Sequence, residues 1–89
     1  MSDATIVRVW VPDVWDVVEI GGQASTTVAS VKASALQQAF GEGRRADPAG
    51  FIVKYRGALV SDESQTLGAL GVPDRAPMIV LPARRRPVV

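Results

Sequence analysis

The sequence contains no cysteine and no histidine. Their absence excludes disulfide bonds, thiol chemistry, histidine general-base catalysis and the usual zinc sites, and we expect no metal and no other cofactor. The sequence also lacks an apolar run near the roughly 18 residues of a membrane-spanning helix, and its Met-Ser-Asp start lacks the basic and apolar regions of a signal peptide. We therefore expect a cytoplasmic protein without a membrane span.

A strong excess of charge of either sign is missing as well. The chain has 10 Lys and Arg residues against 9 Asp and Glu residues, which gives a net charge of +1. Its basic run, Arg84 to Arg86, is too small a footprint for nucleic acid, which we do not expect as a partner. The chain has 89 residues, 47% of them hydrophobic, which is enough for one globular domain with one core.

The segment Thr27 to Phe40 is the only stretch long enough, and free enough of glycine and proline, for a helix of several turns. Its apolar residues recur with helical spacing and form one stripe, and Thr27 and Gly41 suit its two ends. Lys32 lies close to the centre of this stripe. A cation in that position requires either a route to solvent past its neighbours or a carboxylate partner elsewhere in the chain.

Alternation of apolar and polar residues predicts strands on both sides of this helix. The predicted strands cover residues 6–11, about 15–20, 51–56, 58–60 and 78–81, and residues 67–72 form a compact apolar turn. One amphipathic helix covers only one face of a sheet, so the pattern predicts an α+β fold with four or five strands and the helix on one face. We expect one domain over residues 5–82, flanked by a flexible N-terminus (1–4) and a flexible basic tail (83–89).

Several segments together resemble the ubiquitin-like β-grasp family over nearly the whole chain. The segments that carry the resemblance are Thr27-Val28-x-x-Val31-Lys32, Val53-Lys54-Tyr55-Arg56-Gly57, Val60-x-Asp62, Thr66-Leu67-x-x-Leu70-Gly71-Val72 and Pro77-Met78-Ile79-Val80-Leu81. The resemblance implies a mixed sheet wrapped around the helix. It also implies a structural ion pair between Lys32 and Asp62, because the family pairs its helix lysine with an aspartate after the short strand.

Two departures from the family pattern bear on function. The sequence ends in Pro87-Val88-Val89 and not in Gly-Gly, so we expect neither conjugation to other proteins nor sulfur transfer. The isoleucine at the centre of the ubiquitin recognition patch is replaced by Lys54, so we expect poor binding to receptors that grip this patch. Because the sequence shows no catalytic constellation, we do not expect an enzyme.

Strict alternation directs half of the strand residues away from the helix, onto the open face of the sheet. This set has three cations, no carboxylate, a tryptophan and several aliphatic residues, and the basic tail leaves from the same sheet. Apolar anchors surrounded by Arg and Lys are typical of a protein-binding surface for an acidic partner. The residues predicted to bind this partner are Ile6, Arg8, Trp10, Ile52, Lys54, Arg56, Ile79, Leu81, Arg84, Arg85 and Arg86.

The sequence thus predicts a non-catalytic protein-interaction module that docks an acidic or mixed partner surface. The alternatives are a solvated sheet face with scattered apolar residues, a modifier or sulfur carrier with a processed tail, and a module that pairs an edge strand with a partner strand. The Ala-, Val- and Arg-rich composition is typical of a bacterial source. Among bacterial relatives, the chain resembles in length the YukD-like components of type VII secretion and the small accessory subunits of aromatic monooxygenases.

Overall fold

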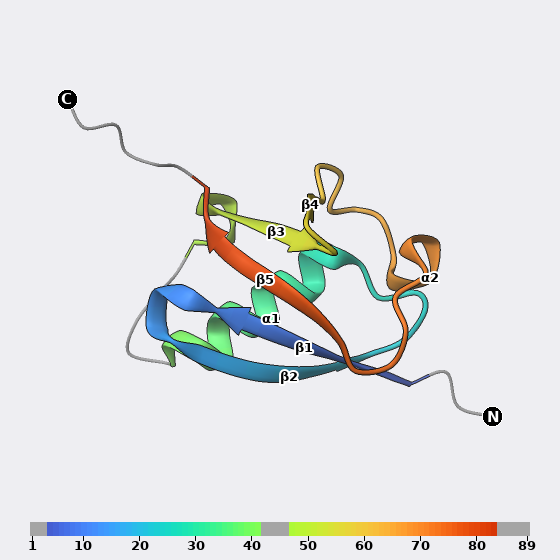
Figure 1. Ribbon diagram of the computed structural model, residues 1–89, viewed down its shortest axis with the longest axis horizontal. Helices are drawn as coiled ribbons and strands as arrows, with labels where there is room; N and C mark the ends of the chain where they lie inside the picture. The colour runs from blue at the N-terminus through green and yellow to red at the C-terminus, as the bar shows by residue number, and fades with distance from the viewer. Residues whose placement is uncertain (1–3, 42–46, 84–89) are drawn as a thin grey trace.

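The computed structural model describes residues 4–41 and 47–83. These residues form a five-stranded sheet, one long helix and several short helical turns (Figure 1). In chain order the elements are β1 (Thr5–Val11), the 3-10 turn η1 (Pro12–Val14), β2 (Asp16–Gly22), α1 (Val28–Phe40), the 3-10 turn η2 (Pro48–Gly50), β3 (Phe51–Tyr55), β4 (Ala58–Leu59), α2 (Leu67–Leu70) and β5 (Ala76–Pro82). Each strand and the long helix expected from the sequence are found, with ends displaced by one or two residues.

The sheet has the strand order β2-β1-β5-β3-β4. The central strands β1 and β5 run parallel, and each of the other neighbouring pairs is antiparallel. Figure 1 shows α1 crossing behind β1 and β5, on one side of the sheet only. The predicted mixed α+β sheet with one covered face is therefore confirmed, and its other face is left open by the described elements.

Helix α1 begins where a later loop supplies acceptors for its first amides. The Thr27 side chain accepts a hydrogen bond from the amide of the third residue after it, at 3.1 Å. The amides of Val28 and Ala29 donate to the backbone carbonyls of Gln65 and Glu63, both at 2.9 Å. Because helix N-terminal amides have no partner within the helix, these bonds fix the loop after β4 against the start of α1.

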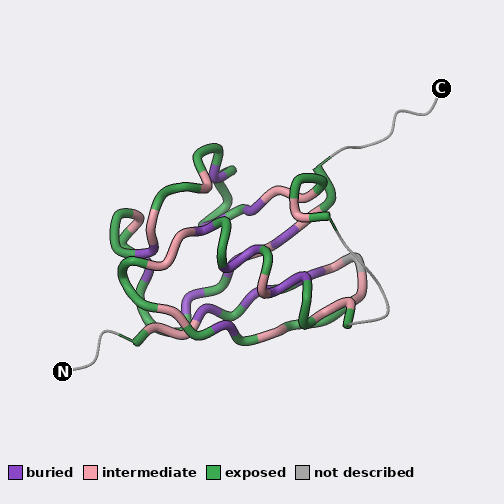
Figure 2. Tube along the Cα trace, turned by 180° about the vertical axis from the view of Figure 1, so that it is seen from behind, coloured by how far each residue is buried: buried purple, intermediate pink, exposed green. Residues whose placement is uncertain are grey.

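The hydrophobic core lies between the sheet and α1. In β1, Val7, Val9 and Val11 are completely buried while Arg8 and Trp10 between them are exposed, as strand alternation requires. Figure 2, viewed from the opposite side, shows that buried positions occur along the strands and along the helix, between exposed ones. The buried apolar residues are Val7, Val9, Val11, Ile20, Val28, Val31, Ala35, Leu36, Val53, Tyr55, Val60, Leu67, Val72, Ala76, Met78 and Val80.

The expected flexible ends fall largely outside the described residues, and so does the predicted partner-binding run Arg84, Arg85 and Arg86. Ala83, which the sequence places in the tail, is instead tied to the domain, because its amide donates to the carbonyl of Gly50 at 2.7 Å.

Candidate functional site

One line of side chains crosses all five strands on the open face. Residues directly opposite each other on neighbouring strands point to the same side of a sheet. The register pairs Val17 with Trp10, Trp10 with Ile79, Ile79 with Lys54, and Lys54 with Leu59. We call these five residues the cross-sheet row. Four of them are apolar and one is a cation.

The apolar members of the cross-sheet row are accessible to a partner. Trp10 is 42% exposed, Val17 51% and Leu59 52%, while Ile79 between them is half-buried. Trp10, Val17 and Leu59, together with Trp15, are the exposed large hydrophobic residues of the described chain. Scattered exposed aliphatics are ordinary on a protein surface, but an aligned set around a tryptophan is typical of an interaction surface.

The structure brings together most of the residues that the sequence assigned to partner binding. Beside the cross-sheet row, Leu81 is opposite Ile52, and Arg8 is opposite Pro77. Ile6 follows the same alternation at the start of β1 and is half-buried. The strand register shows that these residues share one face of the sheet, whereas their role in binding stays a prediction.

Arg56 does not belong to this face as the sequence predicted. The pleat ends at Tyr55, and Arg56 and Gly57 form a two-residue turn with φ values of 57° and 82°. Positive φ at both central residues is the pattern of a type I′ hairpin turn, which ends the alternation of the strand. The guanidinium carbon of Arg56 lies 5.9 Å from the ring centroid of Tyr55, a residue of the covered side.

The open face also contains residues that the sequence-based set missed. Val17 and Glu19 come from β2, Leu59 from β4, and Arg75 from the turn before β5. The alternation of Val18 and Ile20 toward the core could have predicted the two β2 residues. Leu59 lies in a strand of two residues and Arg75 lies outside any strand, so neither carries a periodic signal.

The open face also carries a carboxylate, which the residue set predicted from the sequence did not include. Glu19 lies opposite Arg8 in the sheet, and its Oε2 atom is 3.9 Å from the Arg8 Nε atom. The same Oε2 atom is 3.9 Å from the Arg75 Nη1 atom. The three side chains are each more than half exposed, so these pairs contribute little to stability.

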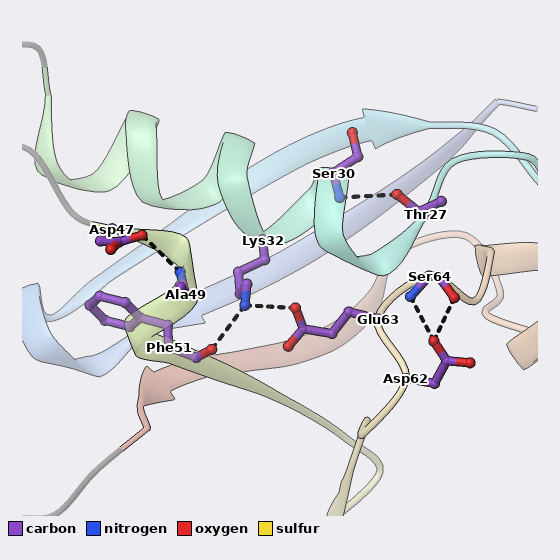
Figure 3. A network of polar contacts seen from close by, with 9 residues as sticks. All are labelled: Thr27, Ser30, Lys32, Asp47, Ala49, Phe51, Asp62, Glu63 and Ser64. Atoms are coloured by element: carbon purple, nitrogen blue, oxygen red, sulfur yellow. Dashed lines mark hydrogen bonds and ion pairs between the residues drawn. The ribbon is translucent and has the colours of Figure 1, made fainter.

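The predicted ion pair of Lys32 with Asp62 is not formed. The Lys32 Nζ atom lies 2.6 Å from the Glu63 Oε1 atom and donates to the Phe51 carbonyl at 2.9 Å (Figure 3). The Ala29 amide donates to the Glu63 carbonyl, which holds residue 63 against the first turn of α1. The lysine of the apolar stripe is thus satisfied by the residue next to the expected one.

Asp62 has a local role in the loop instead. Its Oδ1 atom accepts hydrogen bonds from the backbone amide of Ser64, at 3.1 Å, and from the Ser64 hydroxyl. The hydroxyl bond, followed by the amide bond, holds the pKa of the Asp62 carboxyl below its usual value, because both favour the charged form. The carboxylate is exposed, and Figure 3 shows it directed at Ser64 and away from Lys32.

The described residues offer no group of three His, Cys, Asp or Glu side chains that could hold a metal ion. Within the same residues, no helix has the length and apolar character needed to cross a membrane.

No protein-family model matches the chain, and no curated protein matches it in sequence. Among solved structures, it is similar to a ubiquitin of Caldiarchaeum subterraneum, with a TM-score of 0.75 and 15% identity over 94% of this chain and 99% of that one. A ubiquitin-like domain of Arabidopsis thaliana gives a TM-score of 0.74 and 15% identity over 99% of this chain and 86% of that one. A designed protein based on ubiquitin gives a TM-score of 0.77 at 9% identity over the whole of both chains. With this topology and these neighbours, the chain has the ubiquitin-like β-grasp fold.

Proposed function

We propose that this chain is a non-catalytic protein-interaction module that docks another protein on the open face of its sheet. The cross-sheet row is the observation that carries the proposal. Its apolar side chains lie in register on strands from one edge of the sheet to the other, with Trp10 among them. A partly exposed tryptophan within an apolar patch is the kind of anchor that dominates protein-protein binding energies.

The charges beside the row favour a partner with an acidic or mixed surface. Lys54 lies within the row, and Arg8 and Arg75 lie at its β1 and β5 side. Glu19 is the carboxylate set between the two arginines. Cations that surround an apolar centre would orient an acidic partner and exclude strongly basic ones.

Backbone strain at the residues that precede β2 and β5 supports the same proposal. Trp15, between η1 and β2, has φ 52° and ψ 45° and is 84% exposed. Arg75, before β5, has φ 67°. A left-handed conformation costs a non-glycine residue about 1 kcal/mol, and such an exposed tryptophan returns little burial energy to the fold. Large side chains kept in these positions are consistent with contacts to a partner.

The proposal is tested by affinity capture with matched variants of the whole chain. One bait carries Trp10→Ala with Lys54→Glu on the open face, and the control bait carries Gln38→Ala on the exposed side of α1. We expect a protein that the wild type and the Gln38 variant retain and the open-face variant loses. Purified, this protein should bind the open-face variant at least about tenfold more weakly than the wild type.

Equal binding of that purified protein to the wild type and to the open-face variant would contradict the proposal. The identity of the retained protein also separates the more detailed hypotheses. A secretion ATPase, an oxygenase subunit and a conjugation enzyme would indicate, respectively, a secretion component, an accessory oxygenase subunit and a modifier.

A further inference from the structure

A shallow hollow lies on the open face where β2, β1 and the beginning of β5 meet. Its volume is about 240 Å³. Apolar and cationic groups line it together: Arg8, Trp10, Val17, Arg75 and Pro77. Trp10 and Val17 also belong to the cross-sheet row, so the hollow is continuous with the proposed docking surface. A ligand for this hollow needs an apolar group and a negative charge side by side.

The two guanidinium groups of the hollow retain most of their hydrogen-bonding capacity. Glu19 lies 3.9 Å from each of them, which is longer than a hydrogen bond. Asp74 is 4.0 Å from the Arg75 Nε atom, but its other oxygen accepts from the amide of Ile6 at 2.8 Å. Since a guanidinium offers five N–H donors in a planar fork, both arginines can still bind a carboxylate in the bidentate manner.

The backbone holds Arg75 at this corner. Its amide donates to the Ile6 carbonyl at 2.6 Å, and its φ of 67° lies in the left-handed region. Glycine or asparagine would adopt this conformation at lower cost than arginine. The position thus keeps an arginine against the backbone preference, which makes its side chain a candidate for function.

We propose that the hollow binds a short acidic and apolar segment of the docked partner. A carboxylate of this segment binds between Arg8 and Arg75, and a neighbouring aliphatic or aromatic side chain packs against Trp10, Val17 and Pro77. The inference rests on the proposed docking function and commits it to one partner chemistry. In the free protein, Glu19 takes the place of the partner carboxylate and competes with it.

The experiment uses random short peptides displayed on phage and selected on the whole folded protein. Peptides that also bind the Trp10→Ala variant are removed by counter-selection. We expect the remaining peptides to carry Asp or Glu next to an aliphatic or aromatic residue. One enriched peptide, synthesised with its carboxylate and with the corresponding amide, should lose about tenfold in affinity as the amide, measured by calorimetry.

Variants of residues in the hollow should change the affinity for the peptide in opposite directions, which a purely structural role of these residues would not produce. Arg8→Gln and Arg75→Asn should each lower the affinity for the acidic peptide several-fold. Asparagine is chosen at position 75 because it tolerates the left-handed backbone there. Glu19→Gln should raise the affinity for the same peptide, because the competing carboxylate is gone. Arg56→Gln is the matched control, since Arg56 lies in the β3–β4 turn, and it should leave the affinity unchanged.

The outcomes separate this inference from the proposed function. Peptides that depend on Trp10 but show no acidic preference, or an affinity that Glu19→Gln leaves unchanged or lowers, would overturn the inference and leave the docking surface intact. If the wild type and the Trp10→Ala variant select the same peptides, the inference and the docking function both fail. Folding of each variant is checked by its amide NMR spectrum.

Discussion

Lys32 is a buried cation, and its surroundings depend on the course of a single loop. Only 7% of its side chain is exposed, and its ammonium group contacts one carboxylate and one backbone carbonyl. A buried charge that loses its partner is strongly destabilising, because the cost of removing it from water is no longer offset. Loss of the Glu63 carboxylate should therefore lower the stability of the fold, because it would leave the Lys32 ammonium buried without a counter-charge.

Glu63→Ala should destabilise the fold by about 2 kcal/mol, somewhat less than for a fully buried pair, because the Glu63 side chain is 22% exposed. Asp62→Ala should cause a clearly smaller loss, since the Asp62 carboxylate is exposed and bonds only within its own loop. Urea unfolding of both variants measures the difference. In a Lys32→Met background the effect of Glu63→Ala should largely disappear. A greater loss from Asp62→Ala than from Glu63→Ala would show that the pairing is wrong.

The sequence predicted part of this arrangement. A lysine within an apolar helical stripe requires a route to solvent or a carboxylate partner, and the structure shows the second of these. The resemblance placed the partner at residue 62, whereas it is residue 63. Which of two adjacent acidic residues points inward depends on the path of a non-repeating loop, here fixed by the Ala29 and Glu63 backbone bond, and periodicity carries no information on such a path.

At the scale of elements, the short helix α2 is held by close backbone contact. The Gly68 amide donates to the Ala24 carbonyl at 2.9 Å, which places the two segments too close for a side chain between them. A Cβ atom on Gly68 would lie 3.0 Å from the Ala24 Cβ atom and 3.1 Å from its carbonyl oxygen. The oxygen belongs to the backbone and cannot rotate away as the end of a flexible side chain would.

Gly68→Ala should therefore destabilise the protein by about 1–2 kcal/mol, even though alanine favours a helix more than glycine does. The matched control is Gly21→Ala in β2, where an added Cβ meets no atom within 4 Å. That substitution should change the unfolding free energy by less than about 0.5 kcal/mol. Thermal and urea unfolding distinguish the two, and equal effects would contradict the close contact.

The elements that the sequence predicted best are those with a sustained period. Strand β1 buries the residues that its spacing selects, and helix α1 buries most of its apolar stripe, with Ala39 and Phe40 half-buried. The errors occur where the period stops, as at Arg56, whose turn conformation removes it from the face that alternation assigned to it. Leu59, in the two-residue β4, and Arg75 were missed as residues of the open face for the same physical reason, because turns and very short strands contain too few residues to show which face a side chain takes.

At the scale of the molecule, the two faces of one sheet carry different constraints. The covered face gives the domain its core, so its residues determine stability. The open face buries less apolar surface, because its tryptophan, valine and leucine side chains are exposed to solvent. If the docking proposal is correct, substitutions on the two faces must separate stability from binding.

Neighbouring residues of β5 provide this test. Met78 is 1% exposed in the core, and Met78→Ala should reduce the unfolding free energy by about 3 kcal/mol through lost burial and a cavity. Ile79 is half-buried on the open face, and Ile79→Thr should cost less than about 1 kcal/mol, because threonine keeps the strand preference of isoleucine. In binding to the captured partner the order should reverse, with Ile79→Thr weakening the affinity of folded protein and Met78→Ala leaving it nearly intact. Binding that follows stability in both variants would instead mean that the open face has no separate role.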